Sequence, residues 1–205
     1  MFLEKGFNYA GDLPGALRCL SDMFRLPASD IREIAVKFHG AMLDGLEKSR
    51  GPLKMLPSYL GKPTGEEKGT FLSVDFGGTN MRVLLVELQG SGRIRVKKRK
   101  SIPLKDPGAG YDYTSETATG PELFDFLAAQ IAGFVVPGKP YLLGHTFSFP
   151  FLSHSANEAI LIVWTKEIKT SQVEGRDVNR LLAGALNRRG LHEVRPVAIA
   201  NDAVS

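Results

Sequence analysis

Two short polar segments of the sequence carry the residue types best suited to phosphate chemistry. The first, Asp-Phe-Gly-Gly-Thr-Asn at 75–80, follows an apolar run at 71–74 and leads into a second run at 82–88. Paired glycines let the backbone approach an anion, and successive N–H groups in such a turn form an anion-binding concavity. Asp75 has the wrong charge to attract phosphate, but its carboxylate could hold a divalent cation that bridges to phosphate.

This turn differs from the two common nucleotide-binding loops, since it lacks both Gly-x-x-x-x-Gly-Lys-Ser/Thr and Gly-x-Gly-x-x-Gly. Strand leads to strand here, so a bound phosphate would lie on a β-hairpin. An ordinary hairpin turn is the alternative interpretation of the same residues.

The second polar segment is Asn201-Asp202, which follows an apolar run at 196–200. A hydroxyl is a poor nucleophile, and a carboxylate beyond a buried strand end could accept its proton when the hydroxyl attacks. Lys166 offers a positive charge that would stabilise the transferring phosphoryl group. The structural alternatives are an Asx turn for the Asn-Asp pair and a surface lysine after Trp164.

Further motifs occur in a fixed order: Thr-Phe-Ser-Phe-Pro at 146–150, Trp-Thr-Lys at 164–166 and Val-Glu-Gly at 173–175. Together with the Asp-x-Gly-Gly-Thr-Asn loop and the final Asn-Asp, they resemble the hexokinase family. The thirteen residues between Pro150 and Trp164 match the spacing in that family. The segment at 54–59 also resembles the family's connector into the first strand. The resemblance covers roughly residues 30–205.

The resemblance implies ATP-dependent phosphorylation of a glucose-like hexose at its 6-hydroxyl, with Mg²⁺ as the metal. Asp202 would be the catalytic base, and Lys166 would reach toward the γ-phosphate. The implied sugar ligands are Ser148, Thr165, Lys166, Asn201 and Asp202. The implied phosphate ligands are Gly77, Gly78, Thr79, Asn80 and Arg82, with Asp75 serving Mg²⁺ through water. A solvated strand arginine is the alternative for Arg82.

Three positions depart from the family pattern, namely Ser153, Ala159 and Ala203. They place sugar affinity and choice in question more than the class of reaction. The four histidines, His39, His145, His154 and His192, share no metal-ligand spacing, and His154 is expected to point to solvent.

The fold predicted from the apolar spacing is α/β. Helices are expected at 16–23, from Asp30 with Glu33 as its capping partner, from Pro121, and from Val178 with Asp177 as cap. Strands are expected at 71–76, 82–89, 93–101, 141–147, 159–164 and 196–200. This order is that of the ribonuclease H-like domain of actin-like ATPases and sugar kinases, a mixed sheet with flanking helices.

Three regions are expected along the chain: an N-terminal helical segment and connector at 1–69, a small domain at 70–201, and a hinge at 202–205. The resemblance implies a large domain beyond Ser205 that completes the cleft, so the 205 residues alone are expected to be inactive. The alternative is a non-catalytic module, derived from such a domain, that binds sugar or nucleotide or has a regulatory role.

Composition favours a globular protein, with 43% hydrophobic and 23% charged residues. Six of the cations behind the net charge of +4 lie at 93–100. Alternation in that stretch favours a half-solvated strand, with nucleic-acid binding as the alternative set aside. The single cysteine, Cys19, favours a reducing cytoplasm, and no apolar run is long enough for a membrane span. An uncovered apolar stripe on the helix at 30–48 would favour self-association.

Overall fold

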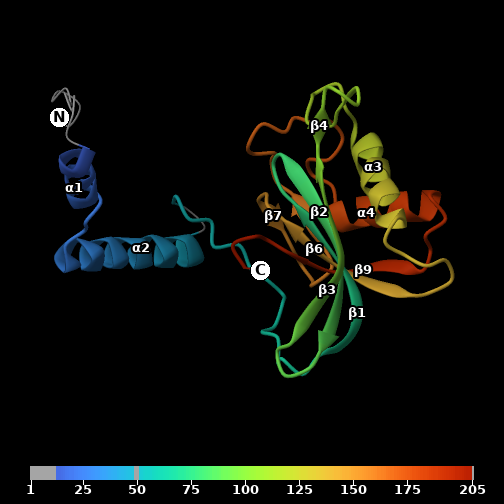
Figure 1. Cartoon of the computed structure of the whole chain (residues 1–205), viewed down its shortest axis with the longest axis horizontal. Coiled ribbons are helices and arrows are strands. Elements are labelled where there is room, and N and C mark those ends of the chain that lie inside the picture. Colours follow the sequence, from blue (N-terminus) through green and yellow to red (C-terminus); the bar gives the residue numbers. More distant parts are fainter. Residues whose placement is uncertain (1–12, 49–50, 205) are drawn as a thin grey trace. The chain divides into compact units, whose positions relative to one another are not determined.

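The computed structural model describes residues 13–48 and 51–204. Contacts divide the chain into two compact units, Met1–Met55 and Leu56–Ser205, which are described separately here (Figure 1). No helix in the described part of the chain has the length and apolar character needed to cross a membrane.

The first unit contains two helices, α1 (Leu13–Met23) and α2 (Ala28–Lys48). Both begin earlier than the sequence predicts. Asp30 therefore lies inside the first turn of α2, where its charge favours the helix dipole, and does not cap it. Pro27 accepts the first backbone hydrogen bonds. Glu33 forms an ion pair with Lys37 at 2.6 Å instead of a capping box.

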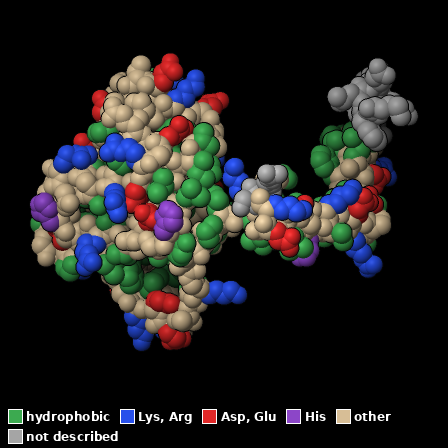
Figure 2. Space-filling model, turned by 180° about the vertical axis from the view of Figure 1, so that it is seen from behind, with side chains coloured by type: hydrophobic (Ala, Val, Ile, Leu, Met, Phe, Trp, Pro, Cys, Tyr) green, Lys and Arg blue, Asp and Glu red, His purple; other side chains and the backbone are tan. Residues whose placement is uncertain are grey.

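Little of either helix is buried. Only Gly45 is buried within the described residues of α1 and α2, and the chain at Leu53 and Met55 returns against it so closely that a Cβ atom would collide with both. Apolar side chains otherwise lie open along both helices (Figure 2). Those of α2 include Ile31, Ile34, Phe38 and Leu46, each more than half exposed.

The second unit is built on a five-stranded mixed sheet in the order β3-β2-β1-β6-β9. Strands β1 (Lys68–Phe76), β2 (Asn80–Gln89) and β3 (Ile94–Pro103) form an antiparallel meander. Strands β6 (Tyr141–Phe147) and β9 (Val194–Ala200) join it in parallel with β1. The predicted α/β fold with a mixed sheet is confirmed.

Two helices, α3 (Gly120–Ala132) and α4 (Val178–Arg188), pack on the same face of the sheet (Figure 1). Asp177 caps α4 as predicted, accepting from the N–H groups of Asn179 and Arg180. Helix α3 begins one residue before Pro121, because Thr119 and Glu122 form a reciprocal capping box. Leu123, Leu127 and Ile131 of α3 are fully buried, as their spacing requires.

Two short hairpins complete the described fold, β4 (Lys105–Asp106) with β5 (Tyr111–Asp112), and β7 (Phe151–Leu152) with β8 (Ile160–Leu161). The strand predicted at 159–164 is therefore wrong in length. Pairing ends where the Ile162 N–H turns to the Pro150 carbonyl, and Ile162 and Val163 are more than a third exposed.

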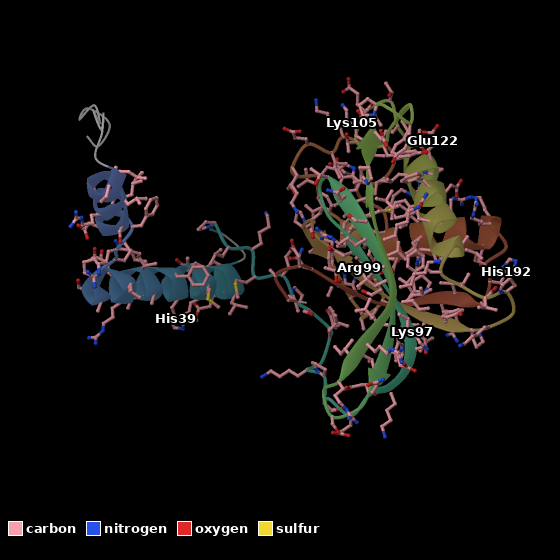
Figure 3. The ribbon with its side chains drawn as sticks, viewed as in Figure 1. His39, Lys97, Arg99, Lys105, Glu122 and His192 are labelled. Carbon is pink, nitrogen blue, oxygen red and sulfur yellow. The ribbon has the colours of Figure 1, made fainter. Side chains whose placement is uncertain are left out.

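Strand β3 is an edge strand exposed on both faces, and not half-buried as its alternation predicts, because Ile94 and Val96 are 66% and 51% exposed. Lys97 and Arg99 are exposed (Figure 3), and the Lys97 amine lies 3.5 Å from the Glu87 carboxylate of β2. Two other cations reach back to α3: the Lys98 amine donates to the Gly133 carbonyl at 2.6 Å, and Lys100 donates to Gln130 at 2.9 Å. They sit at the helix C-terminus, where cations are favourable.

Candidate active site

The turn between β1 and β2 has backbone N–H groups that could bind an anion, although neither Gly77 nor Gly78 has a positive φ. The Gly77 N–H donates to the Asn80 carbonyl at 3.0 Å, which closes the turn, and the Leu104 N–H binds the Thr79 carbonyl from outside. Within the described part of the chain, the N–H groups of Gly78 and Thr79 donate to no other group. Two unengaged N–H groups at a glycine turn fit an oxygen of a nucleotide phosphate.

Asp75 and Arg82 face each other across this turn, at directly paired positions of β1 and β2. The Arg82 guanidinium donates to the Asp75 carboxylate at 2.6 Å, and both groups remain accessible to solvent. Among the described residues, no three His, Cys, Asp or Glu side chains converge as a metal cage. A single carboxylate beside the turn with the unengaged N–H groups suits Mg²⁺, which keeps several waters and is held chiefly by phosphates.

The Ser-Phe-Pro loop starts where β6 ends, next to the end of β1. The Ser148 N–H donates to the Phe76 carbonyl at 3.1 Å, which continues the pairing of β1 with β6. The Asn201 amide donates to the carbonyls on either side of Ser148, those of Phe147 at 3.3 Å and Phe149 at 3.0 Å. Asn201 thus fixes the backbone that presents Ser148, with its amide hydrogens already engaged.

The segment at 164–166 lies against an aromatic cluster. Trp164 contacts Phe76, Phe147 and Phe149, with ring centroids between 4.8 and 6.4 Å apart. Its indole N–H donates to the Thr170 carbonyl at 2.8 Å. Its backbone N–H donates to the Glu174 carboxylate at 2.7 Å. This support leaves Thr165 and Lys166 exposed beside the loops.

Lys166 is the residue at which the predicted segments meet. Its amine donates to the Ser148 carbonyl at 2.9 Å and lies 5.1 Å from the centre of the Phe149 ring. The same amine is 4.0 Å from the Asp202 carboxylate. Its aliphatic stem lies against Gly78, where an added Cβ would come within 2.5 Å of the Lys166 Cδ. One side chain therefore touches the phosphate turn, the Ser148 loop and the Asn-Asp pair.

Asp202 lies just past the end of β9, and its side chain is 52% exposed. The Ala203 N–H donates to the Asn201 side-chain oxygen at 3.0 Å, and the Val204 N–H donates to the Asn201 carbonyl at 2.9 Å, so the turn after β9 closes without a side-chain hydrogen bond from residue 203. An exposed carboxylate within 4.0 Å of a lysine amine can accept a proton from a hydroxyl placed between the loops.

Two other departures from the family pattern lie in the loop at 153–159. Ser153 is 7% exposed, and its hydroxyl donates to the Glu158 carbonyl at 2.6 Å, so its side chain faces the loop. His154 is exposed as predicted, at 71%, and its ring contacts the Glu158 carboxylate at 2.7 Å. Ala159 is fully buried and binds Val178 of α4 through its carbonyl.

Sequence reasoning missed three contributors to this site. Glu174 anchors Trp164, Phe149 forms the surface under the Lys166 amine, and Gly78 leaves room for the lysine stem. The Val-Glu-Gly motif at 173–175 signalled the first of these, but no role followed from the pattern. The other two contacts join residues more than fifteen positions apart, and no local pattern predicts such pairs.

The sequence matches the hexokinase family model over residues 16–205. It is 36% identical to Hexokinase-1 of Schizosaccharomyces pombe over 191 residues, covering 89% of this chain and 37% of that protein. It is 38% identical to Hexokinase-2 of Rattus norvegicus, covering 89% of this chain and 20% of that protein. The chain thus spans between a fifth and two fifths of these two relatives.

Solved structures give the same result. A hexokinase from Schistosoma mansoni complexed with glucose matches with a TM-score of 0.72 and 38% identity, covering 88% of this chain and 40% of that one. A second hexokinase crystal structure matches with a TM-score of 0.75 and 35% identity, covering 88% and 43% of the two chains. With the motifs, the sheet order and these matches in agreement, the chain belongs to the hexokinase family.

Proposed function

We propose that this chain forms the small-domain side of the active site in an enzyme that transfers the γ-phosphoryl group of ATP to the 6-hydroxyl of a hexose. The observation that carries the proposal is the position of Lys166, which contacts Gly78 of the phosphate turn, the Ser148 loop and Asp202. A donor and an acceptor must meet at one point for phosphoryl transfer.

The residues would divide the work as follows. Ser148 and Thr165 bind and orient the hexose, because each hydroxyl taken from water needs a partner. Asn201 holds the carbonyls on either side of Ser148 with its amide hydrogens and offers its side-chain oxygen to the hexose. Asp202 accepts the proton of the 6-hydroxyl as its oxygen bonds to the γ-phosphorus and the bond to the leaving ADP breaks. The Lys166 amine stabilises the charge on the transferring group.

The nucleotide end of the proposal rests on the turn between β1 and β2. The unengaged N–H groups of Gly78 and Thr79 would bind phosphate oxygens, with Asn80 and Arg82 beside them. Asp75 would hold the water shell of Mg²⁺, whose charge neutralises the phosphates when bound. Arg82 at present pairs with Asp75, so binding Mg²⁺ there requires that pair to rearrange.

The chain covers between 20% and 43% of the four hexokinases compared above, so we assign the opposite wall of the cleft to residues outside these 205. Without that wall, water is not excluded and the reactants are not held together. We expect the purified chain to bind glucose weakly and to release no glucose-dependent ADP. The single cysteine, Cys19, supports a reducing, cytoplasmic location.

The test is a coupled assay of ADP release from ATP, with and without glucose, on the enzyme that contains this chain and on the 205 residues alone. Activity in the former and none in the latter is the expected result. An inactive enzyme that still binds sugar or nucleotide by calorimetry would favour a non-catalytic module. Robust phosphorylation by the 205 residues would contradict the shared-cleft proposal.

A further inference from the structure

Behind the Ser148 loop lie two buried polar side chains to which the proposed reaction gives no role. His145 stands on β6, three residues before Ser148, and is 2% exposed. Asn179 stands in the first turn of α4 and is 3% exposed. In the described part of the chain, neither ring nitrogen of His145 nor the side-chain oxygen of Asn179 has a hydrogen-bond partner. Burying such atoms unpaired lowers stability, so their presence calls for an explanation.

The Asn179 amide joins two parts of the domain. Its Nδ2 donates to the Asn157 carbonyl at 2.9 Å, which leaves its oxygen free for another neighbour. That neighbour is the His145 ring, whose protonated form the Asn179 side chain favours, although no hydrogen bond of standard geometry joins them. The amide thus links the 153–159 loop to the first turn of α4.

The loop at 153–159 is itself a junction between the predicted site segments. Its Ala156 carbonyl accepts from the Ile199 N–H at 2.9 Å, two residues before Asn201. Its Ala159 carbonyl accepts from the Val178 N–H at 2.8 Å, at the start of α4. The loop also continues directly from β7, which follows the Ser-Phe-Pro turn. A shift of this loop would therefore move the Ser148 loop relative to Asp202.

We propose that Asn179 is a positioning residue for the sugar site: it fixes the 153–159 loop through Asn157 and so sets the Ser148 loop relative to Asp202. His145 is a second buried polar side chain close to Asn179. The assignment of Ser148 and Asp202 to sugar rests on the proposed function, but the placement of the loop by Asn179 does not.

The test compares three variants of the 205-residue chain. Asn179→Val removes the donor to Asn157 while keeping a similar volume. His145→Leu with Asn179→Val removes both unpaired polar groups together. Asn187→Val is the matched control, because Asn187 is an exposed asparagine on the same helix. Urea unfolding measures global stability. Native-state amide exchange of the Ile199 N–H measures local opening at the loop, and the fluorescence emission of Trp164, the single tryptophan, detects a change in its surroundings.

We expect Asn179→Val to speed exchange of the Ile199 N–H by roughly fivefold over the Asn187→Val control, the worth of about one hydrogen bond. The double variant should unfold at an equal or higher urea concentration, because two buried polar groups have been replaced by apolar ones. Its Ile199 N–H should still exchange fast, and its Trp164 emission should be shifted. If the Ile199 N–H of the double variant exchanges rapidly while its global stability is undiminished, Asn179 positions the loop. A purely structural role would change exchange only together with stability.

Unchanged Ile199 exchange and Trp164 emission in both variants would overturn the proposal, as would exchange that follows only the change in global stability. In the enzyme containing this chain, Asn179→Val should raise KM for glucose more than it lowers kcat. The chain-level readouts need neither sugar nor ATP. An unaltered enzyme without kinase activity would therefore refute the proposed function while leaving the positioning result intact.

Discussion

Lys166 has a φ of 60°, a left-handed backbone conformation that non-glycine residues seldom adopt. Such a conformation costs about 1–2 kcal/mol. It is maintained here because the amine binds the Ser148 carbonyl and the stem fills the space beside Gly78. Strain of this kind gathers at sites where surrounding contacts over-determine one geometry. The geometry aims a cation at the point where the three loops meet.

Asp202→Ala in the enzyme containing this chain should lower kcat by about 10²–10⁴-fold and alter KM for glucose much less. The carboxylate accepts its proton mainly in the transition state, so its removal costs turnover more than binding. Steady-state kinetics measure the split. Asp125→Ala is the control, since Asp125 is a half-exposed carboxylate paired with Arg188 on the helical side. Near-normal turnover in Asp202→Ala would remove this residue from the base role.

His145 should make the folded chain sensitive to mild acid. Burial lowers its pKa to about 4, although Asn179 and the charge of Asp75 oppose the shift. The unfolded chain binds a proton near pH 6.5 and the folded chain near pH 4. The histidine's contribution to stability is therefore complete above pH 6.5 and is lost as pH falls toward 4. The loss is about 3 kcal/mol.

Urea unfolding between pH 7.5 and 4 measures this effect, and His145→Leu should flatten the profile in that window. Glu67 and Asp112 also have lowered pKa values, near 2, because both carboxylates accept hydrogen bonds. Their influence falls mainly below pH 4.5 and overlaps only the lowest part of the His145 window, so the comparison with His145→Leu isolates the histidine. His192→Gln, at an exposed site, is the control. A slope that survives in His145→Leu would assign the effect to another group.

At the scale of elements, the predictable parts were those with local signals. Strand 141–147 was predicted with its observed bounds, because Pro140 precedes it and the Ser-Phe-Pro motif follows it. The Asp177 cap was also local. The length of the 159–164 strand was overestimated, because an apolar run does not indicate where hydrogen bonding to the partner strand ends. The prediction that β3 buries one of its faces was wrong, because burial depends on which face of the sheet the helices cover.

The candidate site shows the same limit. The motifs named the turn, the loops and the final Asn-Asp pair, and their order indicated the family. No spacing in the chain indicates that the stem of Lys166 lies on Gly78, or that the amide hydrogens of Asn201 bind carbonyls beside Ser148. Such contacts depend on how β1, β6 and β9 align, which a linear pattern does not contain.

Gly78→Ala tests the contact between the β1–β2 turn and Lys166. The added methyl would come within 2.5 Å of the Lys166 Cδ and 3.0 Å of its Cβ, so the lysine or the turn must shift. We expect the free energy of unfolding to fall by about 1 kcal/mol, at the low end for overpacking, because the Lys166 side chain is 46% exposed and can partly move away. Gly144→Ala is the control, since no atom lies within 4 Å of a Cβ built there. Equal urea midpoints for the two variants would contradict the observed contact.

At the scale of the whole molecule, the helices of the first unit present an apolar surface with little cover. Ile34 and Phe38 of α2 are 55% and 57% exposed, and they lie one helical turn apart on one side. We predict that the 205-residue chain self-associates through this stripe, one copy against another, because exposed apolar area of this kind favours association.

Light scattering against concentration measures the association. Ile34→Glu with Phe38→Glu should yield a monomer, whereas Glu47→Lys, nine positions from Phe38 and so on the far side of the helix, should not. A monomer at all concentrations in the unaltered chain, with no binding of an apolar dye, would refute the prediction.

The cations of β3 are not equivalent to one another. The amines of Lys98 and Lys100 donate hydrogen bonds to the end of α3, and the Lys98 amine also lies 5.0 Å from the centre of the Phe134 ring. An acetyl group on Lys98 would remove its charge from a helix terminus that favours cations. Acylating reagents should therefore modify Lys97 faster than Lys98 and Lys100, whose amines are released when the end of α3 frays. The order in which these lysines are labelled would then record how firmly the helix is held against the sheet.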